Sequence, residues 1–341
     1  MPVVPILVEV LRGSLVESAH RASVVVSDAE GRVRLGLGDT ARAVFPRSAV
    51  KIVQALPLVE SGAADAYGFG AQELALAAAS HNGEDWHVAT AAAMLARAHR
   101  SEADLECGAH WPARQEDCGR LHVAGLKPGA LHNNCSGKHA GFVCYACHAG
   151  IDPKGYTAVD HPVQQAAKAA LEDVFGTVLG VESCGIDGCS IPTWAIPLDR
   201  LATGMARLAT GQGLAPGRAA AARRIMEASI AEPFMVAGTK RFCTDFMTAL
   251  GGVAYAKTGA EGVFCAAIPS LGLGIAVKCD DGASRAAEVV VATVIAALLG
   301  RSDAPELERF LRPVLTNWNR MTVGGLRPSA ELVEAAATLA P

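Results

Sequence analysis

Hydrophobic and polar residues alternate near the N-terminus at the two-residue period of β-strands. This partial alternation predicts two or three antiparallel strands, at residues 6–11, 15–27 and 33–37. The sequence Asp28-Ala29-Glu30-Gly31 predicts the turn before the third strand. Similar patterns predict three later strands, at residues 253–256, 263–268 and 273–279, joined by glycine-containing turns. Residues 281–299 are apolar over a longer stretch and predict a helix that lies on a sheet.

The middle of the chain is alanine-rich with helical spacing, interrupted by glycine-containing loops. Strands at both ends with helices between them predict an α+β fold. We expect a single unit of residues 1–341, in which an antiparallel sheet flanked by helices is built from residues 1–45 and 252–341. A central helical lobe is expected at residues 46–251, with a cleft between the two lobes.

Composition narrows the class of protein. Of 341 residues 51% are hydrophobic and 19% are charged, which indicates a core-rich globular protein and excludes disorder. The net charge of -4 provides no overall positive field, so we expect no nucleic-acid or membrane partner and a small-molecule substrate. The N-terminus lacks the basic segment of a secretory signal, and the ten cysteines are expected to be thiols or metal ligands in a cytoplasmic protein.

Three short motifs contain nucleophiles and bases. Ser48 and Lys51 are three residues apart at a predicted helix start, so a lysine with a lowered pKa would be able to activate the serine. Ser80 and Asn82 follow an alanine-rich helix, and Lys257-Thr258-Gly259 ends a predicted strand. Each motif alone also fits a solvated surface or an ordinary helix end. In this order, the three are typical of serine β-lactamases and penicillin-binding proteins.

A second cluster contains possible metal ligands. Cys135 and Lys138 are three residues apart, and Cys189 lies in a glycine-rich loop that is able to approach them. Thiolates favour Zn²⁺, and three protein ligands would leave one coordination position open. Lysine binds a metal only as the neutral amine. Buried thiols without a metal are the alternative.

Five segments together resemble the rhizobial-type, class 3 L-asparaginases of the asparaginase II family. The resemblance covers nearly the whole chain and rests on residues 46–51, 80–83, 133–139, 184–189 and 257–262. It implies a serine-β-lactamase-like fold, a homodimer and hydrolysis of L-asparagine through two Ser-Lys pairs beside a zinc ion.

The resemblance also implies roles for individual residues. Ser48 would pair with Lys51, and Ser80 with Lys257, while either serine could form the covalent intermediate. The zinc ligands would be Cys135, Lys138 and Cys189, and Asp187 would contact these ligands rather than the metal. Substrate binding is expected from Arg47, Asn82 and His139. The guanidinium of Arg47 suits a carboxylate, although an ion-paired surface arginine is the alternative.

The sequence therefore predicts an amidohydrolase that converts L-asparagine to L-aspartate and ammonia through a serine acyl-enzyme. Glutaminase, or another hydrolase of the serine β-lactamase fold, is the alternative within the same class. A non-catalytic zinc or thiol sensor is the alternative outside it, because the chain has ten cysteines.

Overall fold

The computed structural model describes residues 3–341, which form two compact units. The sheet unit comprises the chain up to Ala49, Ile196–Arg207 and Ala249–Pro341. The helical unit comprises Val50–Ala195 and Leu208–Thr248. The chain first passes from one unit to the other between Ala49 and Val50.

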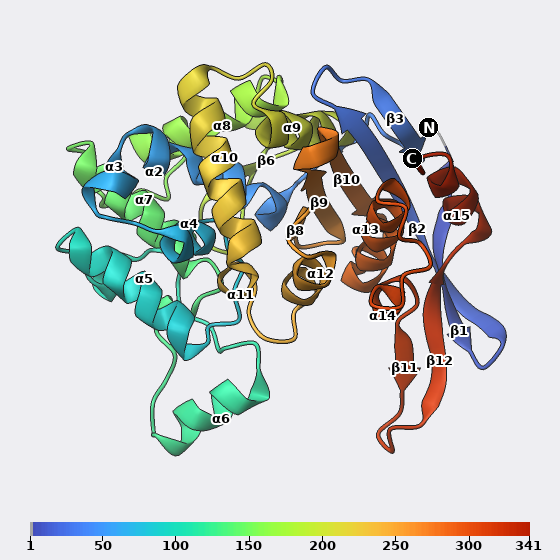
Figure 1. Ribbon diagram of the computed structural model, residues 1–341. Helices are drawn as coiled ribbons and strands as arrows, with labels where there is room; N and C mark the ends of the chain where they lie inside the picture. Colours follow the sequence, from blue (N-terminus) through green and yellow to red (C-terminus); the bar gives the residue numbers. More distant parts are fainter. Residues whose placement is uncertain (1–2) are drawn as a thin grey trace. The chain divides into compact units, whose positions relative to one another are not determined.

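An eight-stranded antiparallel sheet forms the sheet unit (Figure 1). Its strands follow the order β11-β12-β1-β2-β10-β9-β8, and β3 pairs with β2. The strands are β1 (Ile6–Arg12), β2 (Leu15–Asp28), β3 (Val33–Leu37), β8 (Tyr255–Thr258), β9 (Val263–Ile268), β10 (Leu273–Cys279), β11 (Val314–Thr316) and β12 (Thr322–Pro328). Because β1 pairs with β12 and β2 with β10, the predicted sheet of N-terminal and C-terminal strands is confirmed.

Two strand predictions differ from the structure. Strand β8 begins two residues later than the pattern predicts, so Lys257 and Thr258 lie within it. Strands β11 and β12 were not predicted, because consecutive glycines interrupt the pattern of β12. Gly324 is one of them, and a Cβ there would lie 1.8 Å from the carbonyl oxygen of Leu11 on the neighbouring strand. The close pairing of β12 with β1 therefore requires Gly324. The same glycine interrupts the sequence pattern from which the strand would be predicted.

A long apolar helix, α13 (Ser284–Leu298), covers one face of the sheet and contacts β9 and β10 (Figure 1). Twelve of its 15 residues are buried, as the apolar stretch predicts. The helix begins three residues later than expected. The Asp281 carboxylate accepts a hydrogen bond of 2.9 Å from the backbone N–H of Ala283, and this turn precedes the helix.

The sheet unit also includes Ile196–Arg207, from the middle of the chain. The predicted boundaries at residues 46 and 251 placed this segment in the helical lobe. Helix α9 (Leu198–Thr210) packs on β10 at Gly274, where a Cβ would lie 2.1 Å from the Ala202 oxygen and 2.4 Å from the Ala206 nitrogen. Only a residue without a side chain, as at Gly274, allows the α9 backbone to approach β10 so closely. Just before α9, β7 (Ile196–Pro197) pairs with β4 (Ala43–Val44).

The helical unit is formed by helices of 4 to 16 residues. They are α1 (Lys51–Gln54), α2 (Leu56–Glu60), α3 (Ala63–Ala66), α4 (Ala71–Ala77), α5 (Asp85–Arg97), α6 (Gln115–Val123), α7 (Ser136–His148), α8 (Pro162–Phe175), α10 (Pro216–Ala231), α11 (Pro233–Val236) and α12 (Phe242–Leu250), of which α12 ends in the sheet unit. Ten of the 13 residues of α7 are buried. A Cβ at Gly137 would lie 2.4 Å from the Leu76 oxygen, so this glycine lets α7 and α4 touch. A hairpin of β5 (Cys184–Ile186) and β6 (Pro192–Trp194) completes the unit.

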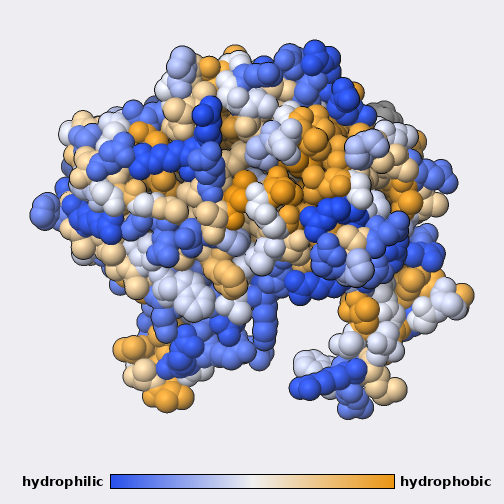
Figure 2. Space-filling view, viewed as in Figure 1, coloured by the Kyte–Doolittle hydropathy of each residue, from blue (hydrophilic) through white to orange (hydrophobic). Residues whose placement is uncertain are grey.

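The described residues also include free thiols and exposed apolar side chains. All ten cysteines are free thiols. Figure 2 shows exposed hydrophobic residues at its lower left. Val123, the last residue of α6, is 92% exposed. Within residues 3–341, no helix is both long enough and apolar enough to cross a membrane.

The contact between α9 and β10 predicts the effect of a single methyl group. Gly274→Ala should lower the free energy of unfolding by about 1 to 3 kcal/mol, because the new Cβ would overlap backbone atoms that are not able to move aside. Thermal and denaturant unfolding would measure the loss. The control is Gly217→Ala in α10, where a Cβ would meet nothing within 4 Å, and it should be neutral or slightly stabilising. Equal stability of the two variants would contradict this account of the packing.

Candidate active site

The first predicted serine lies in a 3-10 helix, Arg47–Val50, just before α1. Ser48 is half-buried and belongs to the sheet unit, whereas Lys51 belongs to the helical unit. Arg47 has a φ of 52°, in the left-handed region that residues other than glycine rarely adopt. Such conformations persist where the surrounding structure holds them, and they are frequent at functional sites.

Within the sheet unit, the predicted Lys257-Thr258-Gly259 motif lies against the segment that carries this serine. A Cβ at Gly259 would lie 2.6 Å from the Pro46 oxygen and 3.3 Å from the Ala49 nitrogen. The side chain of Lys257 is 1% exposed, and its Nζ donates a hydrogen bond of 2.9 Å to the Thr258 carbonyl oxygen. The fold therefore brings the first and third motifs together, although more than 200 residues separate them.

Within the helical unit, Lys51 contacts the second motif. Its Nζ donates to the Ala79 carbonyl oxygen (2.5 Å), the Ser80 Oγ (3.0 Å) and the Cys135 Sγ (3.0 Å). Lys51 is only 1% exposed, and this burial lowers the pKa of its amine against the opposing effect of the nearby Cys135 thiolate. A lysine of this kind is able to release its proton and then accept one from a neighbouring hydroxyl.

The three predicted zinc ligands also meet in the helical unit. Cys135, at the start of α7, and Cys189, in the loop between β5 and β6, are both buried, and the Nζ of Lys138 donates to the Cys189 Sγ at 2.9 Å. A hydrogen bond from the Cys189 thiol and the nearby lysine charges lower the pKa of Cys135 well below its usual value. The same bond raises the pKa of Cys189. Burial opposes the charge on Lys138, but attraction to both sulfurs outweighs it and raises the pKa of this amine.

Asp187 shapes the loop between β5 and β6 that carries Cys189. Its backbone N–H donates to the Ile191 carbonyl oxygen at 2.8 Å, and its Oδ1 accepts from the Gly188 N–H at 2.7 Å. The carboxylate also adds to the raised pKa of Lys138. Asp187 therefore acts on the thiol cluster by its charge and by fixing the turn that carries Cys189.

His139 presents a polar atom in a buried position. Its Nδ1 lies 2.6 Å from the Tyr156 Oη, which accepts a hydrogen bond from the Glu106 backbone N–H at 2.9 Å. The tyrosine hydroxyl is able to donate its proton to Nδ1, and in that arrangement the imidazole proton is on Nε2. Within residues 3–341, Nε2 has no hydrogen-bond partner. Burial and the charges of Lys138 and Lys51 lower the pKa of His139 well below its usual value, so the ring is neutral.

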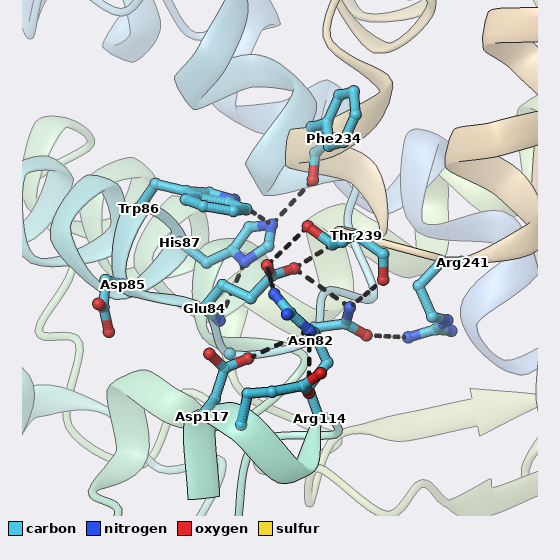
Figure 3. Close-up of polar contacts among 12 residues, drawn as sticks. Asn82, Glu84, Asp85, Trp86, His87, Arg114, Asp117, Phe234, Thr239 and Arg241 are labelled. Atoms are coloured by element: carbon cyan, nitrogen blue, oxygen red, sulfur yellow. Dashed lines mark hydrogen bonds and ion pairs between the residues drawn. The ribbon is translucent and has the colours of Figure 1, made fainter. Parts of the chain in front are cut away.

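Asn82 takes part in a buried network that the sequence did not predict (Figure 3). Its Nδ2 donates to the Glu84 Oε1 (3.1 Å) and the Thr239 carbonyl oxygen (3.0 Å), and its Oδ1 accepts from the Arg241 Nη1 (3.0 Å). The same Nη1 lies 3.4 Å from the carbonyl oxygen of Ser80. The loop after Ser80 is therefore fixed by a segment about 155 residues further along the chain.

Glu84 is the centre of this network. Its side chain is 1% exposed and accepts hydrogen bonds from the Thr239 N–H (2.8 Å), the Thr239 hydroxyl (2.8 Å) and the Arg114 Nη1 (2.7 Å). Burial raises the pKa of Glu84, but the bonds from Thr239 and Arg114 outweigh it and hold the pKa below its usual 4.5. Glu84 is therefore an ionised carboxylate with all its donors supplied by the protein.

The predicted residues thus form two groups. The helical unit brings together Lys51, Ser80, Asn82, Cys135, Lys138, His139, Asp187 and Cys189, whereas the sheet unit contains Arg47, Ser48 and Lys257. Sequence reasoning missed Glu84, Tyr156 and Arg241. Only Glu84 gave a signal in the sequence, as an acidic residue two positions after Asn82 in a predicted motif.

Residues 8–328 match the family described as L-asparaginase II, which spans nearly the whole described chain. A family match of this extent shows the class of protein to which the chain belongs. The chain belongs to the L-asparaginase II family. The family resemblance expected from the five motifs is therefore confirmed.

Similarity to individual proteins says less about this chain than the family match does. No curated protein matches the sequence. Three similar solved structures are of a protein named Mglu. Its native form has 16% identity over 84% of this chain and 66% of that one (TM-score 0.41), its tris and glutamate form 15% over 84% and 61% (0.42), and its form in 4.3 M NaCl 14% over 83% and 61% (0.39). This chain therefore spans less than two thirds of those proteins, and the similarity does not define its activity.

The carboxylate of Glu84 predicts how stability depends on pH. Glu84→Gln should lower the free energy of unfolding by about 2 to 3 kcal/mol near neutral pH, because it removes the buried carboxylate that pairs with Arg114 at 2.7 Å. The pKa of Glu84 is lowered on folding, so its contribution is present above pH 4.5 and is lost as the pH falls through the lowered value. Denaturant unfolding at about pH 7 and about pH 3 should show the difference from wild type shrinking in acid.

The matched control for this measurement is Glu116→Gln. Glu116 lies 3.6 Å from the same arginine, but its side chain is 59% exposed. Its removal should change stability little at either pH. A difference between wild type and Glu84→Gln that stays constant or grows in acid would contradict the assignment of Glu84 as the buried anion.

Proposed function

We propose that the protein hydrolyses L-asparagine to L-aspartate and ammonia through a serine acyl-enzyme. The observation that carries the proposal is the buried Lys51 amine, 3.0 Å from the Ser80 hydroxyl, in a chain of the L-asparaginase II family. A serine β-lactamase-like fold is part of the same proposal. It is supported by the order of the three motifs and by the sheet in which the N-terminal and C-terminal strands pair.

The lysine supplies the base. A neutral amine has two N–H groups and one lone pair, and Lys51 has three polar neighbours. The Ala79 carbonyl oxygen and the Cys135 sulfur accept the two N–H groups, which leaves the lone pair for the Ser80 hydroxyl. Burial favours this neutral form, because it lowers the pKa of the amine.

The family resemblance assigns the remaining roles. Ser48 attacks the side-chain amide carbon and transfers its proton to Lys51, while Ser80 and Lys257 carry protons to the leaving ammonia and then activate water. Which of the two serines forms the ester stays open. The contact between Lys51 and Ser80 supports Ser80 as a second candidate for the nucleophile.

Zinc is proposed as the cofactor. Among residues 3–341, no group of three or more His, Cys, Asp or Glu side chains is arranged to hold a metal ion, so the site depends on Lys138 as its third donor. Cys135, Lys138 and Cys189 fit zinc by chemistry, because two sulfurs and an amine are donors that zinc accepts once they have lost their protons. Bound zinc would supply a Lewis acid that helps to hold the substrate. The homodimer and the cytoplasmic location expected from the sequence stay predictions.

The substrate assignment is tested by ammonia release. The wild type should release ammonia from L-asparagine with a kcat/KM about 100-fold above that for L-glutamine, because one additional methylene displaces the reacting carbon. Ser48→Ala and Ser80→Ala should each lower kcat by about 10³-fold or more while the protein stays folded. Comparable values for the two amino acids would replace the asparaginase assignment with a glutaminase-asparaginase. Near-normal turnover by a folded serine variant would remove that serine from the mechanism.

The metal assignment is tested by stoichiometry. Protein purified without metal and titrated with Zn²⁺ should bind about one ion per chain, more weakly at low pH because the ligands must lose protons. Cys135→Ala should abolish this tight site. Cys265→Ala, which changes a buried thiol in β9, should keep it. Unchanged stoichiometry in Cys135→Ala would exclude the proposed ligand set.

A further inference from the structure

Arg241 is a half-buried cation without a carboxylate partner. Its Nη1 donates to the Asn82 Oδ1 at 3.0 Å and to the Ser80 carbonyl oxygen at 3.4 Å. Among residues 3–341 no acidic side chain pairs with it, and its Nε and Nη2 make no hydrogen bond. The planar fork of a guanidinium suits a carboxylate, and no carboxylate of the described residues occupies this one.

The protein fixes the orientation of this guanidinium. Both N–H groups of the Asn82 amide are used, on Glu84 and on the Thr239 carbonyl oxygen, so its Oδ1 is the atom that faces Arg241 (Figure 3). Glu84 is in turn held by Arg114 and Thr239. One guanidinium nitrogen therefore binds protein groups, while the other two have no hydrogen-bond partner among the described residues.

The backbone of the same segment is pressed against the network. Gly238 has a φ of 104°, and a Cβ there would lie 2.4 Å from the Glu84 Oε1 and 2.8 Å from the Asn82 Nδ2. Lys240, next to the arginine, has a φ of 59° without being a glycine. The left-handed conformation of Lys240 costs free energy, and the segment places Arg241 beside the loop that carries Ser80.

We propose that Arg241 binds the α-carboxylate of the amino-acid substrate, and that Glu84 is a positioning residue that orients it through Asn82. This inference rests on the proposed amide hydrolysis and deepens it by naming a specificity-determining residue. Ser80 connects the two ends of the site, because Lys51 contacts its hydroxyl and Arg241 its carbonyl oxygen. Two carbon atoms separate the carboxylate and the amide of asparagine, so a substrate held by its carboxylate would present its amide at a defined place.

The test compares L-asparagine with 3-aminopropanamide, the same molecule without its α-carboxylate. Arg241→Gln should lower kcat/KM for L-asparagine by roughly 10- to 100-fold, mainly through KM, because hydrogen bonds to a charged group are lost. It should leave kcat/KM for 3-aminopropanamide unchanged. Arg241→Lys should recover part of the loss, and Glu84→Gln should repeat the pattern at smaller size.

The matched control is Arg120→Gln, which removes an arginine of the same unit that pairs with Asp117 and Asp85. It should change neither substrate. If the wild type does not turn over 3-aminopropanamide, competitive inhibition by L-aspartate and by β-alanine gives the same comparison, since β-alanine is L-aspartate without its α-carboxylate. Thermal unfolding confirms that each variant is folded.

Equal losses on both substrates would overturn the proposal and show a structural role for Arg241. No loss on either would overturn it as well, and a selective loss in Arg47→Gln instead would transfer the role to Arg47. Failure of the proposed function is a separate result, because it appears as absence of ammonia from L-asparagine in the wild type. Selective binding of L-aspartate over β-alanine, and its loss in Arg241→Gln, would still test Arg241 in that case.

Discussion

Burial of two lysine amines is the constraint on which the candidate site depends. Lys51 and Lys138 are each 1% exposed, and an ammonium ion removed from water costs several kcal/mol unless neighbouring groups compensate it. The helical unit compensates with sulfur, since Cys135 accepts from Lys51 and Cys189 from Lys138. The two amines respond differently, because burial lowers the pKa of Lys51 whereas attraction to the sulfurs raises the pKa of Lys138. In the proposed reaction, Lys51 is therefore the amine that exchanges a proton with a hydroxyl.

A second, more polar network, around Glu84, fixes the loop that carries Ser80. Lys51 holds this loop through the serine hydroxyl, and the network around Glu84 holds it through Asn82. Because Glu84 is ionised and supplied with donors by the protein, it orients other groups rather than exchanging protons. The division between an amine of lowered pKa beside the sulfurs and fixed charges around Glu84 fits the proposed amide hydrolysis, in which one group reacts while others hold the substrate.

The sheet unit contributes rigidity at the points where backbones touch. Gly274 lets α9 rest directly on β10, and Gly259 lets the end of β8 approach Pro46. In both places the absence of a side chain determines the distance between two elements. The positions of Ser48 and Lys257 within this unit are therefore set by main-chain packing, which tolerates less adjustment than contacts between flexible side chains.

The sequence by itself determined the strands β1, β2, β3, β9 and β10, the apolar helix α13 and the residues of the reactive motifs, because alternation, apolar length and spacing are local properties of a chain. Only the tertiary structure decided that Lys51 contacts Ser80, that Tyr156 orients His139 and that Arg241 joins Asn82. The partners in these contacts are 17 to 159 residues apart and follow no period. Their proximity arises from burial, since each buried polar group must find a partner among whatever the packing of helices brings near, and that packing is a property of the whole fold.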